Sequence, residues 1–267
     1  MIGSGTQALI DGGSLLRTEI VPVHCLIVEA GSALVLVDTG YGTRDITAPS
    51  GPMRFFRQVT RASSDLDETA AAQVRRLGYA PEDVTDIVLT HLHLDHAGGL
   101  PDFPQARVHV YAAERAGAQA PRSLTERMAY RPEHWAHGPN WVPYHAAAED
   151  WFGLPATPPI GLGEAEFRLV PLPGHSVGHC AVALRMDDGW LLHCGDAYVD
   201  ALQIDLSAPW QPPNTLPARA MTGIFPMIGA IYDHAPALRE LRTRHGDRVQ
   251  MFCAHDFDEL TRYQKGS

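Results

Sequence analysis

The chain has 267 residues, 45% of them hydrophobic, and its 31 acidic against 21 basic side chains give a formal charge of −10. This length can bury one substantial core, and no run of about 18 apolar residues predicts a membrane-spanning helix. Lys265 is the only lysine and no basic cluster exists, which disfavours nucleic-acid partners. Met1–Ile20 holds no sustained apolar block, so a secretory signal is disfavoured and the cytoplasm is the expected location.

The apolar patterns predict strands and helices along most of the chain. In the first half, the predicted elements are the hairpin strands Val23–Val28 and Ala33–Val37, a loop-rich stretch at Thr47–Arg61, a helix from Ser64 to Gly78, the strands Ile87–Thr90 and Val108–Tyr111, and a helix at Ala112–Ala118. In the second half, they are a strand at Phe167–Val170, a hairpin of Cys180–Leu184 and Trp190–His193, an irregular stretch at Pro209–Asn214, a helix at His234–Arg244 and a last strand at Val249–Cys253.

Residues 121–160 show weak periodicity and are rich in aromatic side chains and prolines. A stretch of this kind between strands can fold over a site as a cap and shape substrate binding. It can equally be a surface loop anchored by Trp141 and Trp151, and the sequence leaves both interpretations open.

The most informative stretch is His91-Leu92-His93-Leu94-Asp95-His96, which directly follows the predicted strand Ile87–Thr90. Alternate side chains of an extended chain point the same way, so His91 and His93 can bind one ion together. Asp95 and His96 come after the chain bends and can serve a neighbouring ion. Imidazole suits zinc and similar metals, and a carboxylate adds charge for a second cation. The alternative is a histidine-rich turn whose rings are simply hydrogen-bonded.

Three more predicted strands end in a possible metal ligand, and in two of them Gly or Pro stands beside it. Their ends are Pro173-Gly174-His175, Cys194-Gly195-Asp196 and Ala254-His255-Asp256. Open sheets of α/β proteins bind ligands at the carboxyl edge of their strands, where the loops gather. The four strand ends together predict one shared metal site.

These motifs, taken together, resemble those of the metallo-β-lactamase superfamily of hydrolases: His-x-His-x-Asp-His, then Gly-His, Gly-Asp and a near-terminal Ala-His-Asp. Val35–Gly40 is similar to the amino-terminal strand and turn of that superfamily, so the likeness runs from about residue 23 to about residue 258. The resemblance implies an α/β fold, the four-layered αββα sandwich, with residues 1–267 forming a single domain.

The same resemblance implies the metal ligands. One ion would be held by His91, His93 and His175, the other by Asp95, His96 and His255, and both by Asp196 as a bridge. Asp38 would orient ligand histidines from behind, or it merely forms the turn before Gly40. With the ligand set complete, His134 and His137 are interpreted as surface or pocket residues. Two divalent ions are expected, zinc first, with manganese, iron or cobalt as alternatives.

A carboxylate at Asp196 resembles the lactonases, glyoxalase II-type thioesterases and phosphodiesterases of the superfamily. The true zinc β-lactamases carry Cys or Ser at this position. The motifs look closest to the N-acyl-homoserine-lactone lactonases, which place a tyrosine three residues beyond the bridging Asp to polarise the lactone carbonyl. Here Tyr198 lies two residues beyond Asp196, and Val199 occupies the matching offset. Tyr198 is therefore a candidate catalytic residue, with packing as the alternative.

The predicted chemistry is hydrolysis of an ester-like bond in a small-molecule substrate. Two cations about 3.5–4 Å apart lower the pKa of a shared water toward neutrality. The bridging hydroxide would attack a carbonyl, and Asp95 would pass a proton to the leaving group. A lactone is the first expected substrate, a thioester or another carboxylic ester the second, and a phosphodiester the third. An iron-dependent redox enzyme and a non-catalytic metal-binding protein are the alternatives from other classes.

Overall fold

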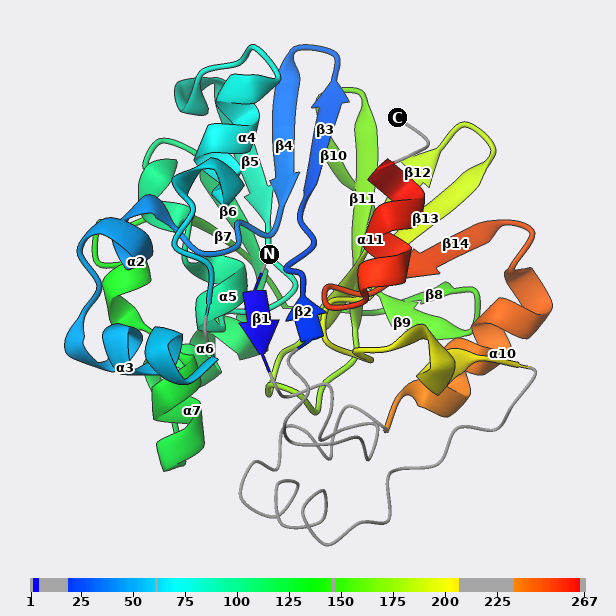
Figure 1. Cartoon of the computed structure of the whole chain (residues 1–267). Coiled ribbons are helices and arrows are strands. Elements are labelled where there is room, and N and C mark those ends of the chain that lie inside the picture. The colour runs from blue at the N-terminus through cyan, green and yellow to red at the C-terminus, as the bar shows by residue number, and fades with distance from the viewer. Residues whose placement is uncertain (1, 5–18, 61, 146, 207–232, 265–267) are drawn as a thin grey trace, which may run out of the picture.

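The structure is a computed structural model that describes residues 2–4, 19–60, 62–145, 147–206 and 233–264. Two five-stranded sheets form its centre (Figure 1). The first sheet has the order β3 (Leu26–Ala30), β4 (Ala33–Val37), β5 (Val84–Val88), β6 (Arg107–Tyr111) and β7 (Asn140–Tyr144). The second has the order β10 (Ile160–Leu162), β11 (Ala165–Pro171), β12 (Cys180–Met186), β13 (Gly189–His193) and β14 (Val249–Phe252).

Helices cover the outer faces of both sheets (Figure 1). On the first sheet lie α4 (Ala70–Arg76) and α6 (Ala112–Gln119). The helices α2 (Thr43–Thr47), α3 (Gly51–Thr60) and α7 (Leu124–Ala129) group at the lower left of Figure 1, and the short α5 (Leu94–Ala97) follows β5. Beside the second sheet lies α10 (Ala235–His245), and α11 (Phe257–Gln264) follows β14. Two small hairpins pair β1 (Ile2–Ser4) with β2 (Glu19–Val21), and β8 (Glu149–Trp151) with β9 (Leu154–Ala156). The predicted αββα sandwich is confirmed.

Strand periodicity explains the layers, because alternate side chains leave a sheet on opposite faces. In β4, Leu34 and Leu36 pack in the core that contains Val74 of α4, whereas Val35 and Val37 pack in the core between the sheets. The second sheet divides in the same way: Val182 of β12 faces the first sheet, and Ala181 and Ala183 face the core that contains Leu238 of α10.

One predicted loop is a helix. Thr47–Arg61 was expected to be loop-rich because of Pro49, Gly51 and Pro52, but Gly51–Thr60 forms α3. Gly51 and Pro52 are the first two helical residues, a place where proline is tolerated because its missing N–H has no intrahelical partner there. Met53 is buried, and Arg57 donates hydrogen bonds to the carbonyl oxygens of Asp45 (2.7 Å) and Ile46 (3.2 Å). Tertiary contacts thus stabilise a helix whose first residues resemble a turn.

The other predicted elements within the described residues are present, with shifted ends. The predicted helix from Ser64 to Gly78 is a short 3-10 turn at Leu66–Glu68 followed by α4. The irregular stretch predicted at Pro209–Asn214 lies outside the described residues. Within the part of the chain that the structure describes, no helix is both long and apolar enough to cross a bilayer.

Residues 121–160 are more regular than the sequence indicated, because they contain α7, β7 and the β8–β9 hairpin. Trp141 packs against the core between the first sheet and α4, and Trp151 is buried in the core between the second sheet and α10. Tyr130 forms an isolated antiparallel bridge with His93. This stretch therefore touches the predicted metal site, and its role as a cap stays a prediction.

Candidate metal centre

All the predicted ligands lie at one edge of the two sheets. His91–His96 follows β5, His175 follows β11, Asp196 follows β13 and His255 follows β14. Strands β13 and β14 are parallel, and β11 runs in the same direction because it is two antiparallel steps from β13. Their carboxyl ends therefore meet at the same edge, where a parallel arrangement gathers its loops.

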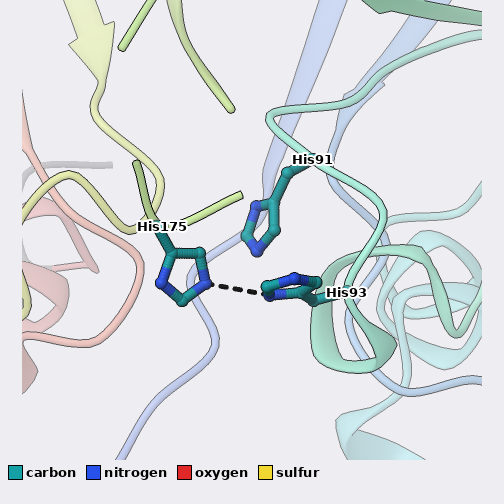
Figure 2. Close-up of side chains that lie close together, drawn as sticks. All are labelled: His91, His93 and His175. Atoms are coloured by element: carbon teal, nitrogen blue, oxygen red, sulfur yellow. Dashed lines mark hydrogen bonds between the residues drawn. The ribbon is translucent and has the colours of Figure 1, made fainter. Parts of the chain in front are cut away.

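The first group consists of His91, His93 and His175, whose rings converge from two loops (Figure 2). His93 Nδ1 lies 2.9 Å from His175 Nε2. Burial lowers the pKa of His93 and of His175 to about 3 and that of His91 well below its ordinary value. The three rings are therefore neutral, and neutral imidazole nitrogen is the form that binds a metal.

The second group consists of Asp95, His96 and His255. Oδ2 of Asp95 lies 3.9 Å from Nε2 of His96 and 3.8 Å from Nε2 of His255. Burial alone lowers the pKa of His96, but the carboxylates of Asp196, Asp95 and Asp38 raise it well above its ordinary value. The negative charge of these three carboxylates thus favours binding of a cation at the second group.

Asp196 lies between the two groups. Its Oδ1 is 3.1 Å from Nε2 of His96, and its Oδ2 is 3.1 Å from Nε2 of both His175 and His255. Burial raises the pKa of Asp196, but the facing histidines His255, His96 and His175 outweigh burial and lower it well below its ordinary value. One ionised carboxylate therefore contacts a histidine of the first group and two of the second.

The donor set fits divalent cations. His91 Nε2 is buried and has no hydrogen-bond partner among the described residues, a costly state for a polar atom unless it binds something. Its Nδ1 lies 3.0 Å from the hydroxyl of Thr90. That hydroxyl donates to Asp38 and can accept a hydrogen bond from the N–H of Nδ1, which leaves the lone pair of Nε2 facing the site. Nitrogen and carboxylate oxygen donors of this kind suit zinc and neighbouring metals.

Asp38 contacts His96 on the side of its ring that faces away from the metal groups. The carboxylate is fully buried, and its Oδ2 lies 2.8 Å from His96 Nδ1. It also accepts hydrogen bonds from the amide (2.8 Å) and the hydroxyl (2.7 Å) of Thr90. Its φ of 58° is in the left-handed region, a conformation that a non-glycine residue keeps only when its surroundings enforce it. This geometry is that of a carboxylate orienting a ligand histidine.

Two buried residues at the site were not predicted. His179 donates from Nδ1 to the carbonyl of Leu172 (3.0 Å), and its Nε2 accepts the backbone N–H of Asp196 (2.9 Å). Glu114 accepts hydrogen bonds from both loops of the first group, and burial raises its pKa. His179 belongs to the Gly174–His179 motif and could have been suspected. Nothing in the sequence pattern indicated a role for Glu114, because an acidic residue in the first turn of a helix is usually exposed.

The position of Tyr198 favours the packing alternative over a catalytic role. Its side chain is fully buried in the core under the second sheet, and its hydroxyl donates to the carboxylate of Glu259 at 3.2 and 3.3 Å. The ring of Tyr198 thus packs in the core with Leu238 of α10. His134, interpreted as a surface or pocket residue, is buried and pairs with Asp45 at 2.9 Å.

Replacing Tyr198 with phenylalanine should therefore leave kcat and KM unchanged, because the ring keeps its packing and only the hydroxyl's contacts with Glu259 and Cys194 are lost. We expect the free energy of unfolding to fall by about 1–2 kcal/mol. Steady-state kinetics and urea unfolding of Y198F measure both quantities. A large loss of kcat at unchanged metal content would restore the catalytic assignment.

Comparison with known proteins places this chain in one family. A profile of the metallo-beta-lactamase superfamily matches residues 18–226. A protein of Mycobacterium tuberculosis named as a probable metallo-hydrolase is 41% identical over 235 residues, which is 88% of this chain and 74% of that protein. The N-acyl homoserine lactonase AttM of Azorhizobium caulinodans is 28% identical over 246 residues, 92% of this chain and 86% of the lactonase.

Solved structures show the same fold. An N-acyl homoserine lactone hydrolase with N-hexanoyl-L-homoserine bound at its catalytic metal centre superposes with a TM-score of 0.69 at 19% identity, covering 98% of this chain and 92% of that one. The dizinc quorum-quenching lactonase AidC, also with a product bound, has a TM-score of 0.57 at 16% identity, covering 95% and 78% of the two chains.

Proposed function

The chain belongs to the metallo-beta-lactamase superfamily and is a metal-dependent hydrolase, and we propose that it opens lactones of the N-acyl-homoserine-lactone type at a pair of divalent ions. The observation that carries the proposal is the position of Asp196, 3.1 Å from histidines of both groups. The lactonase relatives that match most of this chain support the choice of a lactone as substrate.

Each of the two side-chain groups would bind one of the two ions. His91, His93 and His175 would hold one ion, Asp95, His96 and His255 the other, and Asp196 would serve both. When bound, such a pair of cations supplies Lewis acidity, which polarises a carbonyl and lowers the pKa of a shared water. Zinc is the first candidate for both positions, because the donors are imidazole and carboxylate.

The chain's own residues fix the geometry in advance. Asp38 holds Nδ1 of His96 at 2.8 Å, and Pro22 accepts from Nδ1 of His255 at 2.8 Å. Because Nδ1 of each ring is used in these bonds, Nε2 of each ring faces the site and is the nitrogen that can bind a metal ion. Charges and donors that are already oriented need no rearrangement during the reaction, which is the main source of electrostatic catalysis.

Asp95 is the residue proposed to move a proton. Its side chain is 23% exposed, whereas that of Asp196 is 6% exposed, so Asp95 is the carboxylate of the centre that a substrate can reach. The carboxylate of Asp95 can take the proton from the attacking water on its oxygen that does not hold the ion, and deliver it to the departing alkoxide oxygen. A positioned carboxylate of this kind contributes typically about 10²–10⁴-fold to the rate.

A substrate panel tests the proposal directly. The protein is loaded with zinc or with manganese, its metal content is measured, and it is assayed with lactones of different acyl chains, thioesters and bis-p-nitrophenyl phosphate. We expect two ions per chain and a kcat/KM for the best lactone about tenfold or more above that for the other classes. A chelator should abolish the activity, and added metal should restore it.

The same panel can reject the proposal. Cleavage of the phosphodiester alone would make the protein a phosphodiesterase, and a preference for thioesters would place it with the thioesterases. A single iron per chain without hydrolysis of any of the three would favour the redox class. Two bound ions with no turnover of any substrate would favour a non-catalytic role.

A further inference from the structure

A buried carboxylate lies between the two loops that carry the first metal group. Glu114 is in the first turn of α6 and is fully buried. Its Oε1 accepts the backbone N–H of Leu92 at 2.8 Å, and Leu92 stands between His91 and His93. Its Oε2 accepts the hydroxyl of Ser176, the residue after His175, at 2.6 Å. One side chain is therefore bonded both to the loop that carries His91 and His93 and to the loop that carries His175.

A third bond completes the arrangement. Oε2 of Glu114 also accepts the backbone N–H of Gly178 at 3.0 Å. A buried carboxylate is tolerated only when donors replace the water that it loses, and charge-assisted bonds of this kind are the stronger ones. Any displacement of one loop relative to the other would break at least one of these bonds, so the carboxylate opposes such movement.

Close packing between α6 and the His175 loop restricts movement further. A Cβ added to Gly178 would lie 2.0 Å from the backbone nitrogen of Glu114, and one added to Gly117 would lie 2.2 Å from Cγ1 of Val177. The helix and the loop therefore pack closely at both glycines, and at Gly178 the backbone of Glu114 leaves no room for a Cβ. On the other side, the buried ring of Tyr130 packs against His93, with centroids 5.1 Å apart.

We propose that Glu114 is a positioning residue that fixes the separation of His93 and His175 and thereby sets the affinity of the first group for its ion. The inference rests on the proposed metal centre but not on the substrate. Among the described residues, the hydrogen bonds of Glu114 go to the two loops of the first group and to Tyr130, whose ring packs against His93, and none goes to Asp95, His96 or His255. The second ion should therefore depend much less on Glu114.

Glu114→Gln tests this inference, because it keeps the size of the side chain but replaces one acceptor oxygen with an NH₂ donor. The two stepwise zinc affinities of the full chain are measured by competition with a chromophoric chelator. We expect one affinity to fall by about 10–100-fold, as for other residues that support metal ligands, and the other to stay close to the wild-type value. His175→Ala identifies the step that belongs to the first group.

Asp86→Asn is the matched control. Asp86 in β5 is also a fully buried carboxylate with several partners, since it accepts from Arg107 (2.8 and 3.0 Å) and lies 2.8 Å from His109 Nε2. None of these partners belongs to the ligand loops. D86N should lower the melting temperature without changing either zinc affinity, which separates metal positioning from general stability.

Three outcomes would overturn the inference: unchanged affinities in E114Q, an equal fall of both affinities, or the same fall in D86N. If E114Q does not fold, Ser176→Ala removes the 2.6 Å bond to Glu114 together with the contact of this hydroxyl with Tyr130, and it should weaken the same step in the same direction by a smaller factor. No substrate is used, so a protein that binds two ions and opens no lactone would contradict the proposed function and leave this inference intact.

Discussion

Replacing Asp196 with asparagine is expected to lower kcat/KM for the best substrate by about 10²–10⁴-fold, because cation-assisted charge stabilisation contributes several kcal/mol. The carboxylate contacts His96, His175 and His255 at 3.1 Å each. Asparagine keeps the shape but removes the negative charge and one acceptor oxygen. Both groups should therefore lose affinity, and the metal content should fall from two ions toward one.

Steady-state kinetics and elemental analysis of D196N give both quantities. Asp188→Asn is the control, since Asp188 is an exposed acid in the turn between β12 and β13, and its loss should change neither quantity. A D196N protein that keeps two tightly bound ions and full turnover would show that Asp196 is not shared between them. The dinuclear proposal would then lose its main support.

Asp95→Asn is expected to lower kcat by about 10²–10⁴-fold, the range for a positioned acid or base. The neutral amide cannot take a proton from water and pass it to the leaving oxygen. The size of the defect should depend on the leaving group, because a lactone releases a basic alkoxide that needs the proton. A p-nitrophenyl ester releases a stable phenolate and should lose much less.

The comparison of the two substrates therefore decides what Asp95 does. A large loss with the lactone and a small loss with the p-nitrophenyl ester would support proton transfer. An equal loss with both, together with a lower metal content, would mean that Asp95 acts only as a ligand. Circular dichroism of D95N checks that the fold is intact, which is expected because this side chain is partly exposed.

The prediction for residues 47–61 shows where local reasoning fails. Proline and glycine usually mark turns, and the sequence alone favours a loop there. In the structure, the same residues begin α3, whose Met53 is buried and whose Arg57 binds the carbonyls of Asp45 and Ile46. These partners are several residues away, so the deciding contacts do not appear in a local pattern.

The sequence by itself determined most of the strands and the side chains that meet at their carboxyl edge, and the resemblance of its motifs to a known superfamily implied the αββα sandwich. The apolar alternation of each strand and the His or Asp at its end are local properties, and parallel strands bring their ends together. Only the tertiary structure decided that Tyr198 turns into the core and that Glu114 and His179 lie behind the ligand loops. The physical reason is that burial and hydrogen bonding join residues far apart in the chain, and the spacing of residue types does not record those contacts.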